Sequence, residues 1–210
     1  PYSDLVCDFL DAYSSALRKD HEAKTYPDVM TFAFWARKAN ILQRKNEYFK
    51  QNQGTIRVGR GIVFHIAPSN VPVNFMFSFA FGLLAGNANI VRVPSKRFPQ
   101  VDCMCRVLEQ VLLQDKYQKI HDMCSVVRYE KNKAITDDFS MQSNVRVIWG
   151  GDNTIKEIRT SDLPARSIEI TFADRYSFGV VNAKVLLNSS QEEKRRLAEQ
   201  FYNDTYLMDQ

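Results

Sequence analysis

The chain has 210 residues, a hydrophobic fraction of 45% and a formal net charge of +4. This length can build one good core, and the 28 basic and 24 acidic residues are interspersed, so no basic stripe indicates a nucleic-acid partner. The longest apolar stretch is much shorter than the roughly 20 residues that span a bilayer. We therefore expect a globular protein with no membrane span and no signal peptide.

The cysteines show neither a CxxC pair nor metal-ligand spacing. The four of them are Cys7, Cys103, Cys105 and Cys124. We interpret them as reduced, small hydrophobic side chains of a cytoplasmic protein, and we expect no metal site.

The first fifty residues predict a pair of packing helices. In residues 2–18, large apolar side chains recur at four-residue spacing, at Leu5, Phe9, Tyr13 and Leu17. A second helix is predicted from Tyr26 to about Phe49. Its buried side is expected to carry Phe32, Trp35, Ile41, Leu42 and Phe49. We expect residues 1–53 to form a helical segment that packs on a main domain of residues 54–210.

The next stretch predicts a unit of strand, helix and strand. A short strand at 55–58 leads into a buried strand at 61–67, and a proline-bounded loop follows. Residues 74–84 are apolar on nearly every face, which indicates a buried helix, and residues 89–93 form the next strand. In such parallel βαβ units, ligands bind at the carboxyl ends of the strands.

The remaining elements continue the alternation of helices and strands. Helices are expected at 99–114, 134–141, 153–160 and 191–202, and strands at 124–129, 145–149, 166–172 and 177–181. Asp152 or Asn153 is a suitable N-cap for the helix at 153–160. This pattern predicts an α/β, Rossmann-like fold with a mainly parallel open sheet and flanking helices.

Two polar side chains in this framework suggest chemistry. Asn70 lies between Pro68 and Pro72, and its amide could donate to an oxygen that becomes negative during attack on a carbonyl. The alternative is that Asn70 bonds the backbone of its own loop. Glu169 lies among apolar residues of a strand, where burial would raise its pKa. The alternative is an exposed Glu169 between a buried Ile168 and Ile170.

His65 has apolar neighbours on a core strand. We interpret it as a satisfied core or rim histidine, since no serine or aspartate spacing indicates a catalytic triad.

Two long motifs resemble a known family. HIAPSNVPVNF…FGLLAGNANIVRVPSK at 65–96 and WGGDNTIKEIRTSDLPARSIEITFADRYSFGVV at 149–181 resemble the acyl-CoA (fatty acid) reductases of bacterial bioluminescence and their relatives. These enzymes are a branch of the aldehyde dehydrogenase superfamily. The resemblance implies the N-terminal, cofactor-binding portion of an NADPH-dependent enzyme. Such an enzyme reduces an acyl-CoA or acyl-protein thioester to an aldehyde through a cysteine thioester, and it is expected to be a homo-oligomer at full length.

The resemblance also assigns roles at the first loop and the second strand. It matches Asn70 to the family's oxyanion-stabilising Asn, and we expect Ala67, Pro68 and Ser69 to contact the cofactor. Lys96 stands where family members that prefer NAD carry an acidic residue. A cation there attracts a 2′-phosphate, so NADP(H) is expected as the cofactor.

Other basic and small residues are expected to complete the cofactor site. We expect Ser95 and Arg97 to assist Lys96, and Arg92 as well, although the latter lies within a strand. Val93 departs from the family's usual Lys. The alternative is a solvated basic loop. Gly150 and Gly151 occupy the place of the family's phosphate turn, where glycines permit close backbone approach; the alternative is an ordinary strand-to-helix turn.

The resemblance places Glu169 where the superfamily has its general base. The family's Gly-Gly after this residue is Thr171-Phe172 here, which departs from the pattern. Arg175 and Tyr176 belong to the shared run but receive no role.

The family's nucleophilic cysteine has no counterpart among the four cysteines, and the tail FYNDTYLMDQ resembles the segment that leads into it. We therefore expect a chain truncated before the catalytic cysteine domain and inactive alone. Two alternatives remain: a non-catalytic nucleotide-binding module, and an NAD-linked aldehyde dehydrogenase.

Overall fold

A computed structural model describes residues 1–173, 175 and 178–205 of the chain. Its internal contacts divide the chain into two units, residues 1–173 and 174–210, which are described separately here.

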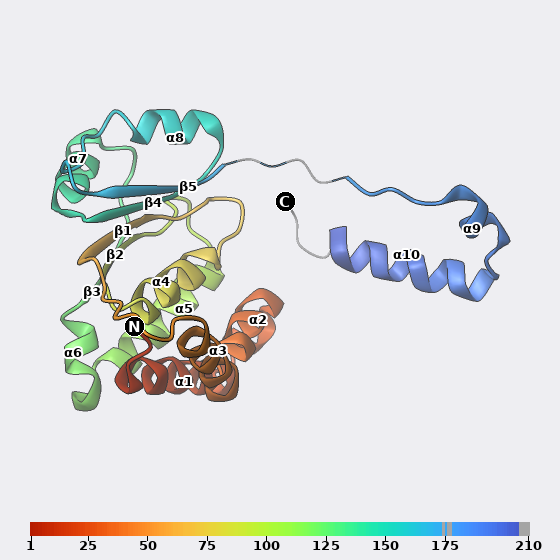
Figure 1. The fold of residues 1–210 in the computed structure, drawn as a ribbon, viewed down its shortest axis with the longest axis horizontal. Helices are drawn as coiled ribbons and strands as arrows, with labels where there is room; N and C mark the ends of the chain where they lie inside the picture. Colours follow the sequence, from red (N-terminus) through yellow and green to blue (C-terminus); the bar gives the residue numbers. More distant parts are fainter. Residues whose placement is uncertain (174, 176–177, 206–210) are drawn as a thin grey trace. The chain divides into compact units, whose positions relative to one another are not determined.

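The first unit is built on a parallel sheet of five strands in the order β3-β2-β1-β4-β5 (Figure 1). The strands are β1 Ile62–Ile66, β2 Ala88–Arg92, β3 Cys124–Val127, β4 Val145–Trp149 and β5 Ile168–Phe172. In the register of the sheet, Val63 lies opposite Asn89 on one side and Val145 on the other. The predicted α/β fold with a parallel open sheet is confirmed.

Helices cover the two faces of this sheet in different ways. Helices α4 Asn74–Leu84 and α5 Pro99–Leu112 lie on one face, and α7 Lys133–Gln142 and α8 Asp152–Ile158 lie on the other (Figure 1). Alternate residues of β1 follow this division. Phe64 and Ile66 pack with Ile155 and Ile158 of α8, whereas His65 points to α4.

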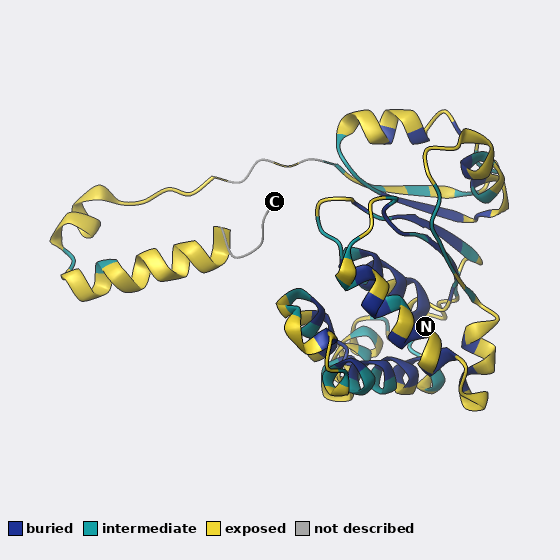
Figure 2. Cartoon of the chain, turned by 180° about the vertical axis from the view of Figure 1, so that it is seen from behind, coloured by how far each residue is buried: buried dark blue, intermediate teal, exposed yellow. Residues whose placement is uncertain are grey.

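The N-terminal helices share one core with α4 and α5. They are α1 Asp4–Lys19, α2 Pro27–Trp35 and α3 Lys38–Gln51, with a short 3-10 helix at Ala23–Thr25. Phe9, Tyr13 and Phe32 are fully buried in this core, which Figure 2 shows as dark blue inner helix faces. A second 3-10 helix, Asp115–Tyr117, and α6 Gln118–His121 lead into β3.

The predicted single helix from Tyr26 to Phe49 is wrong, because two helices, α2 and α3, are separated by a non-helical stretch between Trp35 and Lys38. Helix α2 ends at Trp35, and Arg37, with extended backbone angles of φ −61° and ψ 146°, is the N-cap of α3. The carboxylate of Asp11 on α1 accepts a hydrogen bond from the backbone N–H of Lys38 at 2.9 Å, so a distant side chain caps α3. Phe49 is 51% exposed rather than buried, since α3 buries only one short face.

The strand predicted at 55–58 is also wrong. Ile56 and Val58 are 96% and 78% exposed, and this stretch pairs with no strand of the described residues. A parallel sheet accepts a further strand only at its edge, and residues 55–58 precede the central strand β1.

The second unit contains two helices, α9 Ala183–Asn188 and α10 Gln191–Thr205. The helix predicted at 191–202 is confirmed by α10, whereas α9 was not predicted; the side chain of Asn182 caps it by accepting from Val185 N–H. Residues 178–181 form no strand, contrary to the prediction for 177–181, and residue 177 lies outside the described residues.

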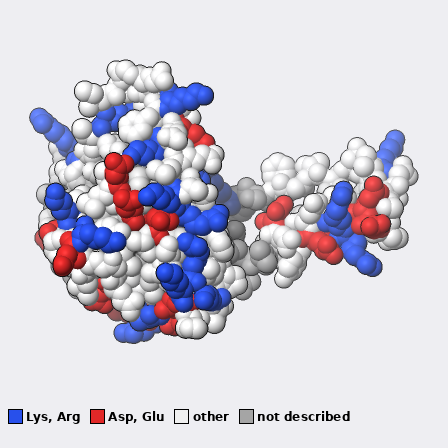
Figure 3. Space-filling model, turned by 90° about the horizontal axis from the view of Figure 1, so that it is seen from below, with Lys and Arg blue, Asp and Glu red and all other residues white. Residues whose placement is uncertain are grey.

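The distribution of charged side chains and the lengths of the apolar helices agree with the sequence analysis. Basic and acidic side chains are interspersed on the face shown in Figure 3. In the described part of the chain, no helix combines the length and the apolar character needed to cross a bilayer.

Candidate functional site

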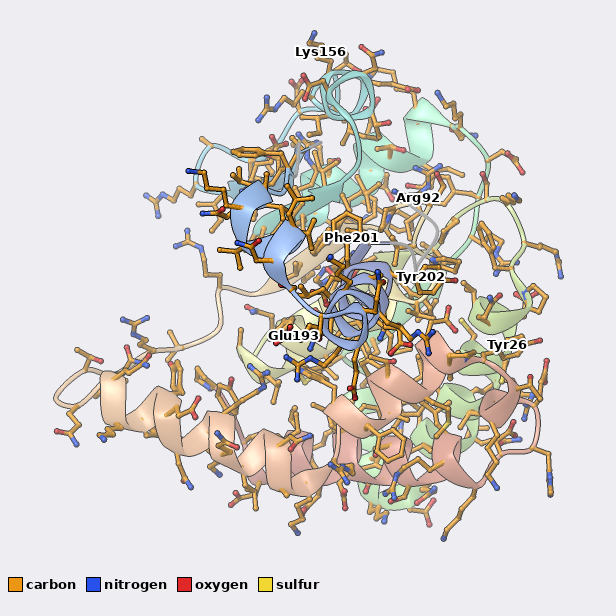
Figure 4. All side chains as sticks on the ribbon, turned by 90° about the vertical axis from the view of Figure 1, so that its right-hand side faces the viewer. Tyr26, Arg92, Lys156, Glu193, Phe201 and Tyr202 are labelled. Carbon is orange, nitrogen blue, oxygen red and sulfur yellow. The ribbon has the colours of Figure 1, made fainter. Side chains whose placement is uncertain are left out.

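The candidate site lies at the carboxyl edge of the sheet, where the five parallel strands end. Their last residues are Ile66, Arg92, Val127, Trp149 and Phe172. Figure 4 looks onto this edge and shows Arg92 among the loops that follow the strands. Parallel sheets of this kind bind ligands at this edge.

The Asn70 loop, residues 67–73, leaves β1 and leads into α4. The N–H of Ala67 donates to the carbonyl of Arg92 at 3.1 Å, which fixes the start of the loop beside β2. Pro68 is buried, whereas Ser69 and Asn70 are exposed. The Asn70 carboxamide forms no hydrogen bond with another described residue. It therefore does not bond the backbone of its own loop, which was the alternative interpretation. Both of its N–H groups are exposed and unbonded.

Arg92 closes β2 and turns towards the α7 face. Its guanidinium carbon lies 4.5 Å from the ring centroid of Tyr129, and its Nη2 donates to the Tyr129 carbonyl at 3.4 Å. Its Nε–H is buried and has no acceptor within the described residues. An unpaired buried donor of this kind is costly, and among the described residues it is shared only with Nε of Arg18.

The loop after β2 presents a second cation. Lys96 is exposed, with its Nζ 5.1 Å from the ring centroid of Phe98, and no carboxylate of the described residues lies within ion-pair distance. Arg97 Nη1 is 3.9 Å from Asp102 Oδ2, and Ser95 is half-buried. Lys96 is therefore the less neutralised cation of this loop.

The turn between β4 and α8 contains Gly150 and Gly151. A Cβ added to Gly150 would lie 3.1 Å from the Thr154 Cβ, so the turn favours a residue without a side chain. Gly151 itself is the N-cap, with no side-chain cap bond. The prediction that Asp152 or Asn153 caps this helix is wrong, because α8 begins one residue earlier than expected.

Glu169 lies within β5 rather than at the carboxyl edge. Its Oε2 accepts from Nη2 of Arg146 at 2.6 Å and its Oε1 accepts from Nε of Arg159 at 2.7 Å. Burial raises the pKa of Glu169, but the hydrogen bonds from Arg159 and Arg146 outweigh it and the pKa is lowered overall. The expected raised pKa is therefore wrong.

The alternative of an exposed Glu169 is wrong too. Ile168 and Ile170 are 40% and 43% exposed, whereas Glu169 is part-buried on the opposite face of β5. The side chains of β5 lie on the faces opposite to those predicted, because Arg146, the neighbour of Glu169 on β4, is 2% exposed and needs a carboxylate partner.

His65 is confirmed as a satisfied core histidine. It is 2% exposed, with Nδ1 2.8 Å from Ser78 Oγ and Nε2 2.9 Å from Asn89 Oδ1. Burial lowers its pKa to about 4. This arrangement brings a serine to the histidine, which the sequence analysis did not predict, but the third member is a neutral amide and cannot stabilise an imidazolium as a carboxylate does.

The thiols are poor nucleophiles. Burial is the largest cause of a raised pKa in all four, to about 11 for Cys103 and Cys105 and about 12 for Cys124. Cys124 begins β3, at the edge of the sheet opposite the site. Cys103 lies near Asp20, whose carboxylate is bound by Arg106 at 2.9 Å.

The structure thus brings most predicted site residues to one edge. These are Ala67, Pro68, Ser69, Asn70, Arg92, Ser95, Lys96, Arg97, Gly150 and Gly151. Glu169 is separated from them by its place within β5. Arg175 is exposed in the second unit, and Tyr176 lies outside the described residues.

Tyr129 was missed as a partner of Arg92. It ends the strand predicted at 124–129, and strands that end at one edge bring their last residues together, so this signal was present in the sequence. The buried contacts of Ser78 and Trp149 gave no such signal, because both residues occur in runs of apolar character.

Comparisons with known proteins agree with this geometry. The family model described as acyl-CoA reductase (LuxC) matches residues 39–210. Comparison with curated protein sequences gave no match.

Solved structures with the same fold are aldehyde dehydrogenases. A lactaldehyde dehydrogenase matches with a TM-score of 0.59 and 12% identity, over 79% of this chain and 38% of its own. The putative aldehyde dehydrogenase PutA of Anabaena variabilis gives 0.57 and 15%, over 79% and 38%. The glyceraldehyde-3-phosphate dehydrogenase GapN of Methanocaldococcus jannaschii, complexed with NADP, gives 0.56 and 15%, over 82% and 41%. The chain therefore spans about two fifths of the length of these structures, and the likeness shows the fold.

Proposed function

Since the chain belongs to the acyl-CoA reductase (LuxC) family, we propose that it is the cofactor-binding part of an NADPH-dependent oxidoreductase that converts an acyl thioester into an aldehyde. The substrate class is an acyl-CoA or an acyl-protein thioester. The enzyme acts in the cytoplasm as a homo-oligomer at full length, which the four free thiols and the aldehyde dehydrogenase fold support.

The observation that carries the proposal is the pair of cationic groups at the end of β2. Arg92 holds a buried N–H without an acceptor among the described residues, and Lys96 holds a charge without a carboxylate partner there. Arg92 is the last residue of β2 and Lys96 lies in the loop after it, at the edge where parallel sheets bind nucleotides. A 2′-phosphate would supply a countercharge to these cations, whereas the hydroxyl of NADH would not.

Other residues of the edge would hold the rest of the cofactor. The Ala67–Ser69 stretch and Ser95 flank the cations, and the backbone of Gly150 and Gly151 can approach a pyrophosphate closely. The exposed carboxylate of Asp152 would have to face away from it. When bound, the nicotinamide cofactor supplies the hydride for the reduction.

Asn70 performs the chemical role that this chain can supply. Reducing a thioester carbon to an aldehyde takes one hydride and one proton and releases the thiol. Negative charge develops on the carbonyl oxygen as hydride arrives, and the unbonded Asn70 amide can donate to it. The acyl-enzyme thioester requires a nucleophilic cysteine. The described thiols do not provide it, because burial keeps them protonated.

Glu169 has a structural role in this proposal and is not a general base. Two arginines hold it as a carboxylate, and it lies within β5, away from Asn70. Reduction of an acyl-enzyme also needs no base to activate water.

A titration of the 210-residue chain with NADPH and with NADH tests the cofactor assignment. We expect tighter binding of NADPH, and we expect Lys96→Glu to reverse the preference. Lys24→Glu, in the exposed 3-10 turn of the N-terminal helices, is the control and should leave the ratio unchanged. An unchanged ratio in Lys96→Glu, or tighter binding of NADH by the wild-type chain, would favour an NAD-linked aldehyde dehydrogenase instead.

A nucleotide-binding module without catalysis is the second candidate, favoured by the protonated state of the described thiols. The complete reading frame distinguishes the two. Turnover of acyl-CoA with NADPH by the complete frame, and none by these 210 residues, is the result we expect. Cofactor binding without turnover by the complete frame would support the module.

A further inference from the structure

We infer that Ser78 is a positioning residue that holds both loops of the site, the Asn70 loop and the Gly150–Gly151 turn. The inference deepens the proposed function and rests on it for the meaning of these loops. Ser78 lies on α4 and is 5% exposed. Its Oγ is 2.8 Å from His65 Nδ1 and 3.2 Å from Trp149 Nε1.

The hydrogen-bond directions in this group follow from Asn89. Its Nδ2 donates to the Asn87 carbonyl at 2.9 Å, so its Oδ1 is free to accept from His65 Nε2. The neutral imidazole therefore carries its proton on Nε2 and accepts the Ser78 hydroxyl proton on Nδ1. The Ser78 oxygen then accepts from the Trp149 indole, and every member of the group is satisfied.

The chain places these contacts on both sides of the Asn70 loop. His65 is the residue before the end of β1, and Ser78 lies in the second turn of α4, directly beyond the loop. Their hydrogen bond therefore ties the two ends of the loop together, while Ser69 and Asn70 in its middle are exposed.

The same hydroxyl reaches the second loop through Trp149. Trp149 is the last residue of β4 and directly precedes Gly150. Its indole also stacks on Phe172 at the end of β5, with ring centroids 3.8 Å apart. The Gly150 N–H also donates to the Phe172 carbonyl at 3.2 Å, so Ser78, through the indole, is one of two contacts that set how the chain leaves β4.

The surroundings leave this group little freedom to adjust. A Cβ on Gly82, one turn further along α4, would lie 1.9 Å from Asn89 Oδ1 and 3.0 Å from His65 Nε2. Helix and histidine are thus in close approach, and the hydroxyl of Ser78 has no described substitute nearby. Its loss would leave the buried Nδ1 of His65 and the part-buried Nε1–H of Trp149 without partners.

Hydrogen exchange on Ser78→Ala tests the inference without any ligand. We expect amide exchange to rise roughly tenfold relative to wild type at Ala67 and Asn74, which bound the Asn70 loop and donate to the carbonyls of Arg92 and Val71, and at Gly150, which donates to the Phe172 carbonyl. The rise would come from more frequent local opening. Ser14→Ala is the matched control, because Ser14 is a fully buried helix serine that donates to the Ala33 carbonyl at 2.6 Å, away from the strand ends. It should leave both loops unchanged.

A second variant removes only the hydrogen bond between Ser78 and Trp149. Trp149→Phe keeps an aromatic ring against Phe172 but loses the N–H, so it should raise exchange at Gly150 and leave Ala67 and Asn74 unchanged. This variant also covers the case in which Ser78→Ala does not fold.

The outcomes separate the inference from the proposed function. Unchanged exchange at either loop in Ser78→Ala, or the same rise in Ser14→Ala, would overturn the positioning role. A weaker affinity of Ser78→Ala for NADPH, by roughly 5- to 10-fold, would connect the loops to the cofactor. If the wild-type chain binds no NADPH, the proposed function fails, while the exchange data still decide the role of Ser78.

Discussion

Arg92 combines three features at one residue: a stacked guanidinium, a weak hydrogen bond and an unsatisfied buried N–H. The folded protein gains little from these contacts, and under the proposed function Arg92 binds the cofactor. Stability and binding should therefore separate when Arg92 is replaced.

We expect Arg92→Gln to weaken NADPH binding by roughly tenfold or more, with a small change in melting temperature. Arg128→Gln is the control, since Arg128 is paired with Asp102 at 2.6 Å beside the same sheet edge. Calorimetric titration and thermal unfolding measure the two effects. Equal NADPH affinity in wild type and Arg92→Gln would remove Arg92 from the cofactor site.

Glu169, unlike Arg92, contributes mainly to stability, because its partner Arg146 is 2% exposed and needs the Glu169 carboxylate as a counterion. We expect Glu169→Leu to lower the free energy of unfolding by about 3–5 kcal/mol, the cost of leaving a buried charge unpaired. Denaturant unfolding measures this loss. Asp137→Leu, which breaks the exposed pair with Lys133, should cost less than about 1 kcal/mol. Similar losses in both variants would show that Glu169 is not a buried partner.

The sequence could predict that Asn70 and Lys96 lie in the loops that follow two neighbouring strands, because the prolines around them are local signals. The Arg146–Glu169 pair was not predictable in the same way, since it depends on which strands are neighbours. Alternation along β5 alone assigns the isoleucines to the core, and the pairing with Arg146 reverses that choice.

Among the elements, α4 was predicted with its bounds and α3 was not. Helix α4 has apolar residues on nearly all faces and ends at Leu84, shortly before Gly86-Asn87, so its limits are set by local sequence. The start of α3 is set by Asp11, which lies on another helix and caps Lys38 from there. Such a cap through space leaves no pattern near position 36 or 37.

We expect Asp11→Ala to destabilise the protein by about 1 kcal/mol through loss of this cap. Asp8→Ala is the comparison, because Asp8 only forms an exposed salt bridge with the Lys38 ammonium at 3.1 Å and should cost less than about 0.5 kcal/mol. Urea unfolding of the two variants decides between them. A larger loss in Asp8→Ala would mean that the salt bridge, and not the cap, starts α3.

At the scale of the whole molecule, His65 makes stability depend on pH. Its pKa is lowered from 6.5 to about 4 in the folded state by burial. Between these values the unfolded chain binds a proton that the folded chain does not, so the free energy of unfolding falls as the pH falls from 6.5 to 4. This stabilisation is fully present above pH 6.5.

We expect the free energy of unfolding to fall by about 3 kcal/mol across this window, and we expect a much smaller slope in His65→Gln. His121→Gln is the control, because His121 is exposed at the end of α6. Chemical unfolding at a series of pH values gives the slopes. A slope unchanged in His65→Gln would assign the pH dependence to other groups.

The order of the strands also has a consequence in time. Strand β1 meets β2 within a short stretch of chain, as Ile62 pairs with Ala88, but its other neighbour pairs Val63 with Val145. During synthesis, the central strand therefore has one side unfilled until β4 has left the ribosome. Closing so long a loop is entropically slow, so β1, α4 and β2 should form an early nucleus and β4 and β5 should join last. The helix that carries the Asn70 loop would then be in place before the turn that completes the cofactor site exists.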